Sequence, residues 1–123
     1  MKANEAFDSV CSLISEKYKD SGWKYSKSSH WMTKKDKRFT YKVFFYTSWN
    51  NISDVDVTFH SECAIIPLGS KNNIYCATIR QCDDPNGKLF WNIAKEKDWE
   101  QVINEFTNLL DIEFMPIVRS CIN

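Results

Sequence analysis

The stretch DVDVTFHSECAII, residues 54–66, decides the fold class because its side chains alternate in character. Neighbouring side chains on a strand point to opposite faces, so this alternation predicts a strand with one buried and one solvated face. The residues expected on the apolar side are Val55, Val57, Phe59, Cys63 and Ile65, with Ser61 among them. The residues expected on the polar side are Asp54, Asp56, Thr58, His60 and Glu62. We expect this polar row to be an outward surface rather than a reactive centre, because any sheet with one solvated face produces such a row.

The preceding segment, RFTYKVFFYTSW at 38–49, alternates in the same way and is the expected partner strand. Bringing the two apolar sides together in an antiparallel hairpin requires a connection with an odd number of residues, three or five, around residues 50–52. The five-residue connection places Lys42 opposite Glu62, and the three-residue connection places Lys42 opposite His60. In both registers a lysine lies beside the acidic row, which is a favourable cross-strand arrangement.

Additional strands are expected on both sides of this pair. The expected strands are 23–33, 74–82 and 88–93, with turns at 34–37 and 83–87. Three aromatic residues, Phe44, Tyr46 and Phe90, do not fall on the side that a helix is expected to cover. They indicate strong curvature of the sheet, partial cover by the second helix, or a partner site.

Two amphipathic helices frame the strands. Residues 4–19 repeat apolar side chains at helical spacing, with Asn4 as the N-cap and Gly22 placed to take the left-handed conformation that ends helices. The second helix begins after Asp98, and Pro116 ends or kinks it. The order of helix, about five strands and helix predicts an α+β fold with a mainly antiparallel sheet, in a single domain over residues 1–123.

Composition excludes several classes of protein. Aromatic residues make up 15% and charged residues 26% of the 123 residues, which rules out an intrinsically disordered chain. No apolar run approaches the roughly 20 residues that span a bilayer, and the N-terminus lacks the apolar stretch of a signal peptide. We therefore expect a cytoplasmic protein without membrane contact. The five scattered cysteines fit reduced thiols better than a disulfide scaffold.

Motifs for catalysis, cofactors and metals are absent from the sequence. The histidines His30 and His60 are thirty residues apart, and carboxylates at alternate positions of a strand are spread roughly 7 Å per step, which is too far for one cation. Neither a P-loop nor a dinucleotide-binding glycine motif occurs. Ser61 projects away from His60 and Glu62, so these neighbours form no triad. We expect a protein that is not an enzyme and has no cofactor, metal or small-molecule ligand.

Charge is unevenly divided along the chain, although the formal net charge is zero. Residues 1–46 carry a net charge of +5, and residues 47–123 carry −5. A folded chain can mix its halves in space, but such asymmetry can also mark a partner surface. An acidic surface can mimic phosphates toward a basic partner such as a nuclease. The predicted partner-binding residues are Asp54, Asp56, Glu62, Asp83 and Asp84.

The alternative is a small nucleic-acid-binding module that uses the hairpin 23–46. This hairpin mixes lysines with aromatic residues, which are the ingredients of phosphate contact and base stacking. The residues that would carry this function are Trp23, Trp31, Lys34, Lys35, Lys37 and Arg38. Against it, the pI near 6.7 lies below that of typical nucleic-acid-binding domains, and lysines in a turn are commonly only solvated.

Three segments carry a resemblance to a known group of proteins. They are GWKYSKSSHWMTKKDKRFTYKVFFY after the first helix, CATIRQC, and GKLFWNIAKEKDWEQVI followed by LLDIEFMPIV. Together they resemble small bacterial domains of unknown function that look like immunity proteins, although TIRQCDD stands where those domains have a glycine-containing run. Immunity proteins are encoded beside secreted or contact-delivered toxins, as in contact-dependent growth inhibition. The resemblance implies a non-enzymatic antitoxin that blocks the C-terminal domain of a cognate toxin by occlusion, and it transfers no specific residue.

Overall fold

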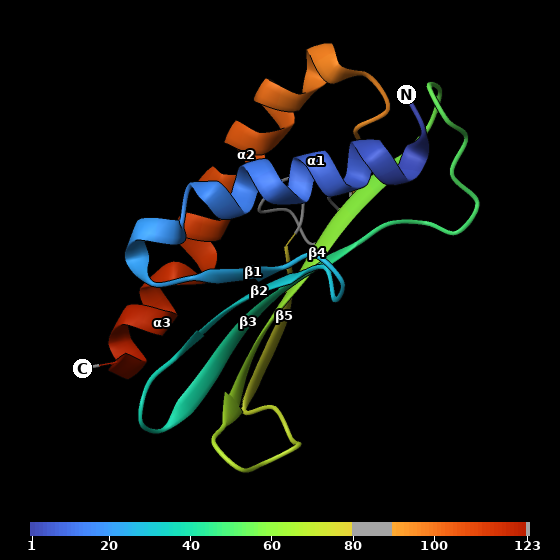
Figure 1. The fold of residues 1–123 in the computed structure, drawn as a ribbon. Coiled ribbons are helices and arrows are strands. Elements are labelled where there is room, and N and C mark those ends of the chain that lie inside the picture. The colour runs from blue at the N-terminus through green and yellow to red at the C-terminus, as the bar shows by residue number, and fades with distance from the viewer. Residues whose placement is uncertain (80–89, 123) are drawn as a thin grey trace.

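The computed structural model describes residues 1–79 and 90–122, and it confirms the α+β class (Figure 1). The helices are α1 (Ala3–Glu16), α2 (Trp99–Glu113) and α3 (Met115–Ile122), with the 3₁₀ helices η1 (Lys19–Ser21) and η2 (Glu96–Asp98). The strands are β1 (Lys24–Ser26), β2 (Trp31–Lys35), β3 (Phe39–Tyr46), β4 (Thr58–Pro67), β5 (Tyr75–Ile79) and β6 (Trp91–Asn92). The order of an N-terminal helix, strands and a C-terminal helix is the predicted one.

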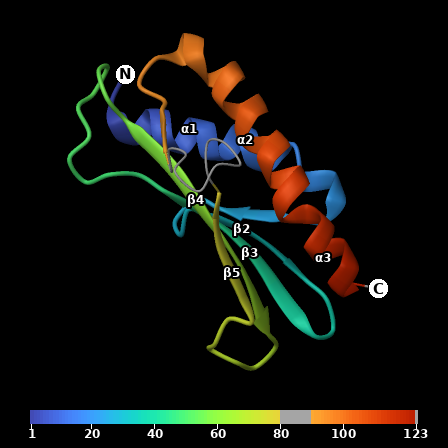
Figure 2. The ribbon, with the colours of Figure 1, turned by 180° about the vertical axis from the view of Figure 1, so that it is seen from behind.

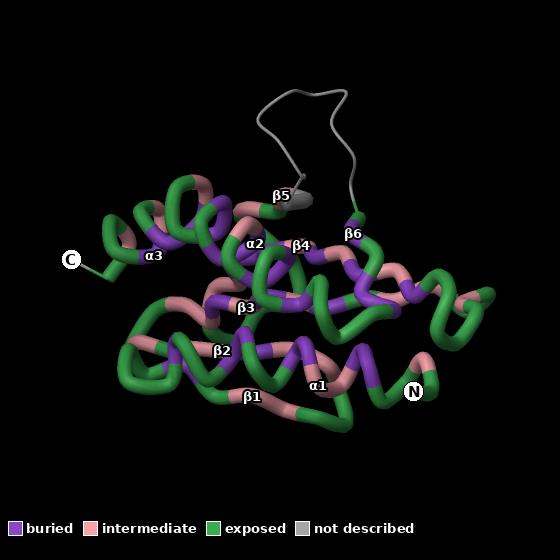
Figure 3. Tube along the Cα trace, turned by 90° about the horizontal axis from the view of Figure 1, so that it is seen from above, coloured by how far each residue is buried: buried purple, intermediate pink, exposed green. Residues whose placement is uncertain are grey.

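The strands form an antiparallel sheet in the order β1-β2-β3-β4-β5, and β6 pairs with the start of β4. The helices pack on one face of this sheet, as the front and back views show (Figures 1 and 2). Viewed from above, buried positions lie on α1, α2 and the central strands, and exposed positions lie at the loops and along the outer sides of the helices (Figure 3). The core therefore lies between the helices and one face of the sheet.

The pairing of β3 with β4 brings the two apolar faces together as predicted. Tyr41 lies opposite Ile65 and Val43 opposite Cys63, and all four are buried. The predicted registers are wrong, however, because Lys42 lies opposite Ala64 rather than Glu62 or His60. The cause is a longer connection over residues 47–57, which forms a turn of its own through a bridge between Ile52 and Asp56. Odd-numbered residues still lie opposite odd-numbered residues, because this connection also has an odd number of residues.

The segment 23–33 is two strands instead of the single expected strand. β1 and β2 pair with each other, and the polar residues between them form a tight turn that ends at His30, where φ is 55°. The backbone N–H of His30 donates to the Ser26 carbonyl oxygen at 2.9 Å, and the His30 carbonyl oxygen accepts from the backbone N–H of Phe45 at 2.9 Å. The ring Nε2 of His30 also lies 2.8 Å from Asp8 Oδ1 on α1, which ties the turn to the helix layer.

The helix ends follow the sequence pattern with one correction. α1 begins at Ala3 with Lys2 at the N-cap position, so the predicted N-cap at Asn4 is wrong. The Glu5 carboxylate accepts the Lys2 backbone N–H at 3.4 Å and so contributes to this helix start. Gly22 has the predicted left-handed conformation, with φ of 92°. Pro116 lies in the first turn of α3, where a missing N–H does not interrupt the helix.

Aromatic packing joins α2 to the sheet. Phe106 of α2 meets Phe59 of β4 edge-on, with ring centroids 5.2 Å apart, and meets Trp91 of β6 edge-on at 5.7 Å. Phe45 of β3 lies 6.3 Å from the same ring. These four side chains are buried, and edge-to-face pairs stabilise a core beyond the area that they bury.

We predict that Phe106→Ala lowers the free energy of unfolding by about 3–5 kcal/mol, because it leaves a cavity among three aromatic rings. Ile112→Ala in the same helix is the matched control, since Ile112 is 60% exposed. The control should change stability by no more than about 0.5 kcal/mol. Urea unfolding followed by tryptophan fluorescence measures both, and equal effects of the two substitutions would contradict this assignment of the core.

Candidate partner-binding surface

The predicted acidic residues do not share one strand. β4 begins only at Thr58, so Asp54 and Asp56 lie in the preceding connection, whereas Glu62 lies on the outward face of β4. The prediction of a single acidic row is therefore wrong. Val55, expected in the core, is 62% exposed because the alternation of the strand does not extend into the loop. The other two predicted residues, Asp83 and Asp84, lie outside the described residues.

Polar side chains hold the β3–β4 connection, residues 47–57, in place. Asn51 Nδ2 donates to Thr47 Oγ1 at 2.6 Å, and Asn51 Oδ1 accepts the backbone N–H of Thr58 at 3.0 Å. On the other side, Asn92 Nδ2 donates to the Val55 carbonyl oxygen at 3.1 Å, and Asn92 Oδ1 accepts the backbone N–H of Val57 at 3.2 Å. Two asparagines thus replace the ladder hydrogen bonds that this segment lacks.

Asp54 has a structural partner at the N-terminus. Its Oδ1 lies 2.6 Å from the terminal ammonium of Met1, and this hydrogen bond and charge lower the pKa of the Asp54 carboxyl below its usual value. The neighbouring Ser53 Oγ accepts the backbone N–H of Ala3 at 3.0 Å. Asp54 also has a φ of 66°, a left-handed conformation that Asp tolerates better than most residues. These contacts engage Asp54 in holding the loop, which leaves Asp56 as the loop carboxylate without such a partner among the described residues.

The same loop exposes large apolar side chains. Trp49 is 96% exposed, Ile52 58% and Val55 62%, and we call these three residues the apolar loop. The alternation in the sequence placed Trp49 on the core side with Phe45, but β3 ends at Tyr46 and Trp49 lies beyond it in the loop. A nearly fully exposed tryptophan on an anchored loop is characteristic of a partner-binding surface.

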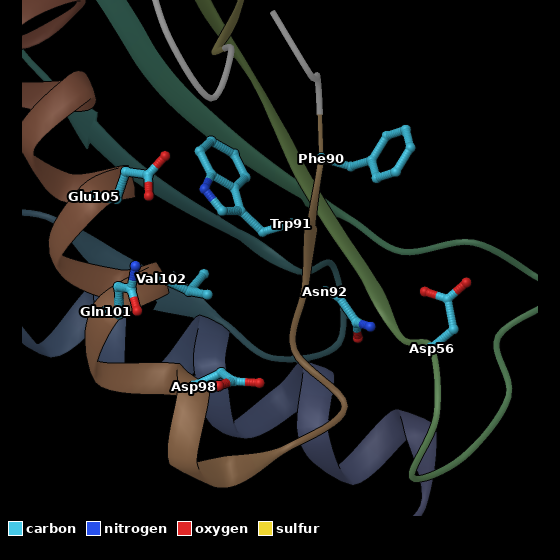
Figure 4. Close-up of a pocket in the computed structure, with 8 residues that line it drawn as sticks. All are labelled: Asp56, Phe90, Trp91, Asn92, Asp98, Gln101, Val102 and Glu105. Atoms are coloured by element: carbon cyan, nitrogen blue, oxygen red, sulfur yellow. The ribbon is translucent and has the colours of Figure 1, made fainter.

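An acidic pocket of about 320 Å³ lies beside this loop. β6 separates its two sides: Asp98, Gln101 and Glu105 of η2 and α2 lie on one side, and Asp56 and Phe90 on the other (Figure 4). Trp91, Asn92 and Val102 complete the lining. Its three carboxylates come from two distant parts of the sequence, since Asp98 and Glu105 are close in the chain and Asp56 is not. Asp56 was among the predicted partner-binding residues, and Asp98 was noted only at the start of the second helix, whereas Glu105 was missed because nothing in its local pattern marks it.

Aromatic side chains also form a row across the outward face of the sheet, which no described helix covers. Trp31 and Phe44 meet edge-on at 5.6 Å, Phe44 stacks on Tyr46 at 6.1 Å, and Tyr46 stacks on His60 at 5.1 Å. Lys42 Nζ lies 4.0 Å from the Trp31 ring centroid, within cation–π distance. This aromatic row accounts for Phe44 and Tyr46 as surface residues, so strong curvature and helix cover do not explain them.

The residues proposed for nucleic-acid binding are not brought together. Trp23 is buried in the core, 6.4 Å from the Phe114 ring, so it is not available for base stacking. Lys34 Nζ donates to the Ser21 carbonyl oxygen at 2.7 Å on the helix side of the sheet. Arg38 Nη2 donates to the Cys121 carbonyl oxygen at 2.8 Å, beside α3. Lys37 is exposed in the turn, and only Trp31 and Lys35 of the six share the outward face.

Three of the groups that could support nucleophilic chemistry, Cys11, Cys63 and Ser61, are enclosed by the core. Burial raises the pKa of the Cys11 and Cys63 thiols well above the usual value, so neither supplies a thiolate near neutral pH. Ser61 Oγ is buried without a hydrogen-bond partner on the side opposite to His60. Among residues 1–79 and 90–122, no group of His, Cys, Asp and Glu side chains is placed to hold a metal ion, and no helix there is long and apolar enough to cross a membrane.

Comparisons with known proteins find no match for this chain among family models, curated proteins or solved structures. The resemblance to immunity proteins therefore stays a prediction from the sequence.

We predict a pH-dependent contribution of His60 to stability. Burial lowers the pKa of His60 below its usual value of 6.5, so the unfolded chain takes up this proton first as the pH falls. The contribution is fully present above pH 6.5 and is lost as the pH falls from there through the folded-state pKa. Between about pH 7.5 and pH 5, the wild type should lose more stability than His60→Gln in urea unfolding. Parallel pH profiles for the two proteins would contradict this prediction.

Proposed function

We propose that this chain is a non-enzymatic immunity protein that binds a bacterial toxin domain with a basic surface, such as a nuclease, and neutralises it by occlusion. The observation that carries the proposal is the apolar loop, Trp49, Ile52 and Val55, exposed beside an acidic pocket. Such a surface has the two parts of a specific interface, which are apolar anchors and a complementary charged region.

The anchoring of the loop favours a binding role. The hydrogen bonds of Asn51 and Asn92 and the contact of Asp54 with the N-terminus fix the loop backbone before any partner arrives. A preordered loop loses less conformational entropy on binding than a mobile one, so more of the contact energy appears as affinity. Trp49 then offers a large rigid side chain of the type that dominates binding energy at interfaces.

Electrostatics favour a basic partner. Asp56, Asp98 and Glu105 line the pocket, and none of the eight lining residues that the structure describes is a lysine or arginine. Next to it, Glu100 and Glu105 line a hollow on the solvent side of α2, together with Lys97. Acidic groups in this arrangement accelerate association with a positively charged surface, and they compete with a nucleic acid for such a surface.

Binding of single-stranded nucleic acid is the second candidate, because Trp31, Phe44 and Tyr46 share the outward face with Lys35 and Lys42. Stacked aromatic residues beside lysines are a common platform for bases and phosphates. Two features oppose it. Lys42 already lies over the Trp31 ring, and Glu62 lies directly opposite Phe44 in the next strand, where it would repel phosphate.

The test of the first proposal is co-expression with the toxin domain encoded beside this gene. The wild type should restore growth and co-purify with that domain. Trp49→Ala should weaken the complex roughly 30-fold, which corresponds to about 2 kcal/mol, because it removes the main apolar anchor.

Ile112→Ala is the matched control, since it also removes an exposed apolar side chain, at 60% exposure, but outside the loop. It should change the dissociation constant less than about twofold. Isothermal titration calorimetry measures both variants. A gene neighbourhood without a toxin, or equal effects of the two substitutions, would contradict the proposal.

The second candidate is tested with fluorescently labelled single-stranded RNA and DNA at low salt, roughly 50 mM. We expect no salt-dependent anisotropy change with micromolar protein. A change that Lys42→Gln and Trp31→Ala both remove would instead establish the outward face as a nucleic-acid site.

A further inference from the structure

The acidic pocket contains an unsatisfied hydrogen-bond donor in addition to its carboxylates. Trp91 is only 3% exposed, and its indole Nε1 is buried without a hydrogen-bond partner. Figure 4 shows Trp91 and Glu105 extending toward each other from β6 and α2. A buried indole N–H normally finds an acceptor, so its lack of one requires an explanation.

Trp99, which is also buried, gives the comparison within the same region. Its Nε1 donates to the Ile93 carbonyl oxygen at 2.8 Å, as expected for a buried indole with a purely structural role. The Trp91 ring is equally fixed, at 5.7 Å from Phe106 and 6.2 Å from Phe59, but its Nε1 meets no backbone carbonyl although the residue lines the pocket. The geometry thus indicates a ligand that supplies a hydrogen-bond acceptor.

The charges of the pocket define the rest of the ligand. The side-chain carboxylates of Asp56, Asp98 and Glu105 make no hydrogen bond or ion pair with any residue that the structure describes. Phe90, 52% exposed, adds an aromatic surface beside Asp56. Carboxylates next to an aromatic ring favour an organic cation. A bare metal ion does not fit, because it offers no acceptor to the Trp91 N–H.

We propose that this pocket binds an arginine or lysine residue presented by a peptide segment. The side-chain cation lies in the pocket that Asp56, Asp98 and Glu105 line, and a backbone carbonyl oxygen of the same segment accepts the Trp91 N–H. Arginine binds more tightly than lysine, because its planar guanidinium can pair with a carboxylate and stack on Phe90. The inference deepens the function proposed above and rests on it for the source of the peptide, a basic segment of the toxin domain.

Hydrogen bonds of Asn92 preorder one side of the pocket for such a ligand. Its side chain accepts the backbone N–H groups of Val57 and Ala94, at 3.2 and 3.0 Å, and donates to the Val55 carbonyl oxygen. These bonds fix the loop that carries Asp56 against β6. The backbone that carries Asp56 is thereby held in place before binding, which favours affinity for a small cationic group.

The test titrates the full chain with a blocked Gly-Arg-Gly peptide, up to about 10 mM at low salt, and follows the indole N–H resonances by ¹H–¹⁵N NMR. Trp91→Phe, which retains a ring in the core, serves to assign the Trp91 signal. We expect a saturable downfield shift of the Trp91 indole proton with the arginine peptide. The same peptide with citrulline, which is neutral and nearly identical in shape, should give no saturable shift.

Charge removal provides the matched variants. Asp98→Asn combined with Glu105→Gln should weaken arginine-peptide binding at least about tenfold, whereas Glu16→Gln, exposed on α1 and outside this pocket, should change it less than about twofold. The absence of a Trp91 shift, an equal shift with citrulline, or equal effects of the pocket and control variants would overturn the inference. The peptide titration contains no toxin, so it tests the pocket separately from the proposed function. If the peptide does not bind but the chain protects growing cells from the toxin, the peptide-binding role of the pocket is rejected and the proposed function is retained.

Discussion

The antiparallel pairing of β3 with β4 is the constraint on which the rest of the structure depends. Because Tyr41 and Val43 lie opposite Ile65 and Cys63, every odd-numbered side chain of the central hairpin faces the helices. Phe106 of α2 packs into the resulting aromatic layer, which fixes the helix relative to the sheet. The even-numbered side chains then face outward without a described helix above them. One register thus determines both what the core contains and what the surface presents.

The length of the β3–β4 connection is the reason that this fold presents a candidate binding surface. A shorter hairpin would have continued both strands and paired their backbone groups with each other. The longer loop instead needs Asn51 and Asn92 for its hydrogen bonds, and it places Trp49 and Val55 in solvent. It also places Asp56 beside β6, where the start of α2 contributes Asp98. The exposed anchors and the acidic pocket therefore have a common structural origin.

The sequence predicted the parts of the fold that depend on periodicity. Alternation identified the two faces of β3 and β4, and helical spacing identified the buried stripe of α2, because these patterns reflect direct contact with the core. The loop was mispredicted because Val55 and Asp56 continue the alternation for a few residues, although the Asn92 side chain and the Ile52 backbone, not a partner strand, bind their backbone groups. The N-cap at Asn4 failed for a similar reason, since a good capping residue does not by itself fix where a helix begins.

The candidate site was only partly predictable, because Asp56 lines the same pocket as Asp98 and Glu105 through tertiary packing that no local pattern records. Hydrogen exchange of the chain, free and bound to the toxin domain encoded beside it, tests the central claim most directly. Our account predicts that binding slows exchange in residues 47–57 and at the start of α2. Slower exchange confined to the β1–β2 edge, with residues 47–57 unchanged, would contradict it.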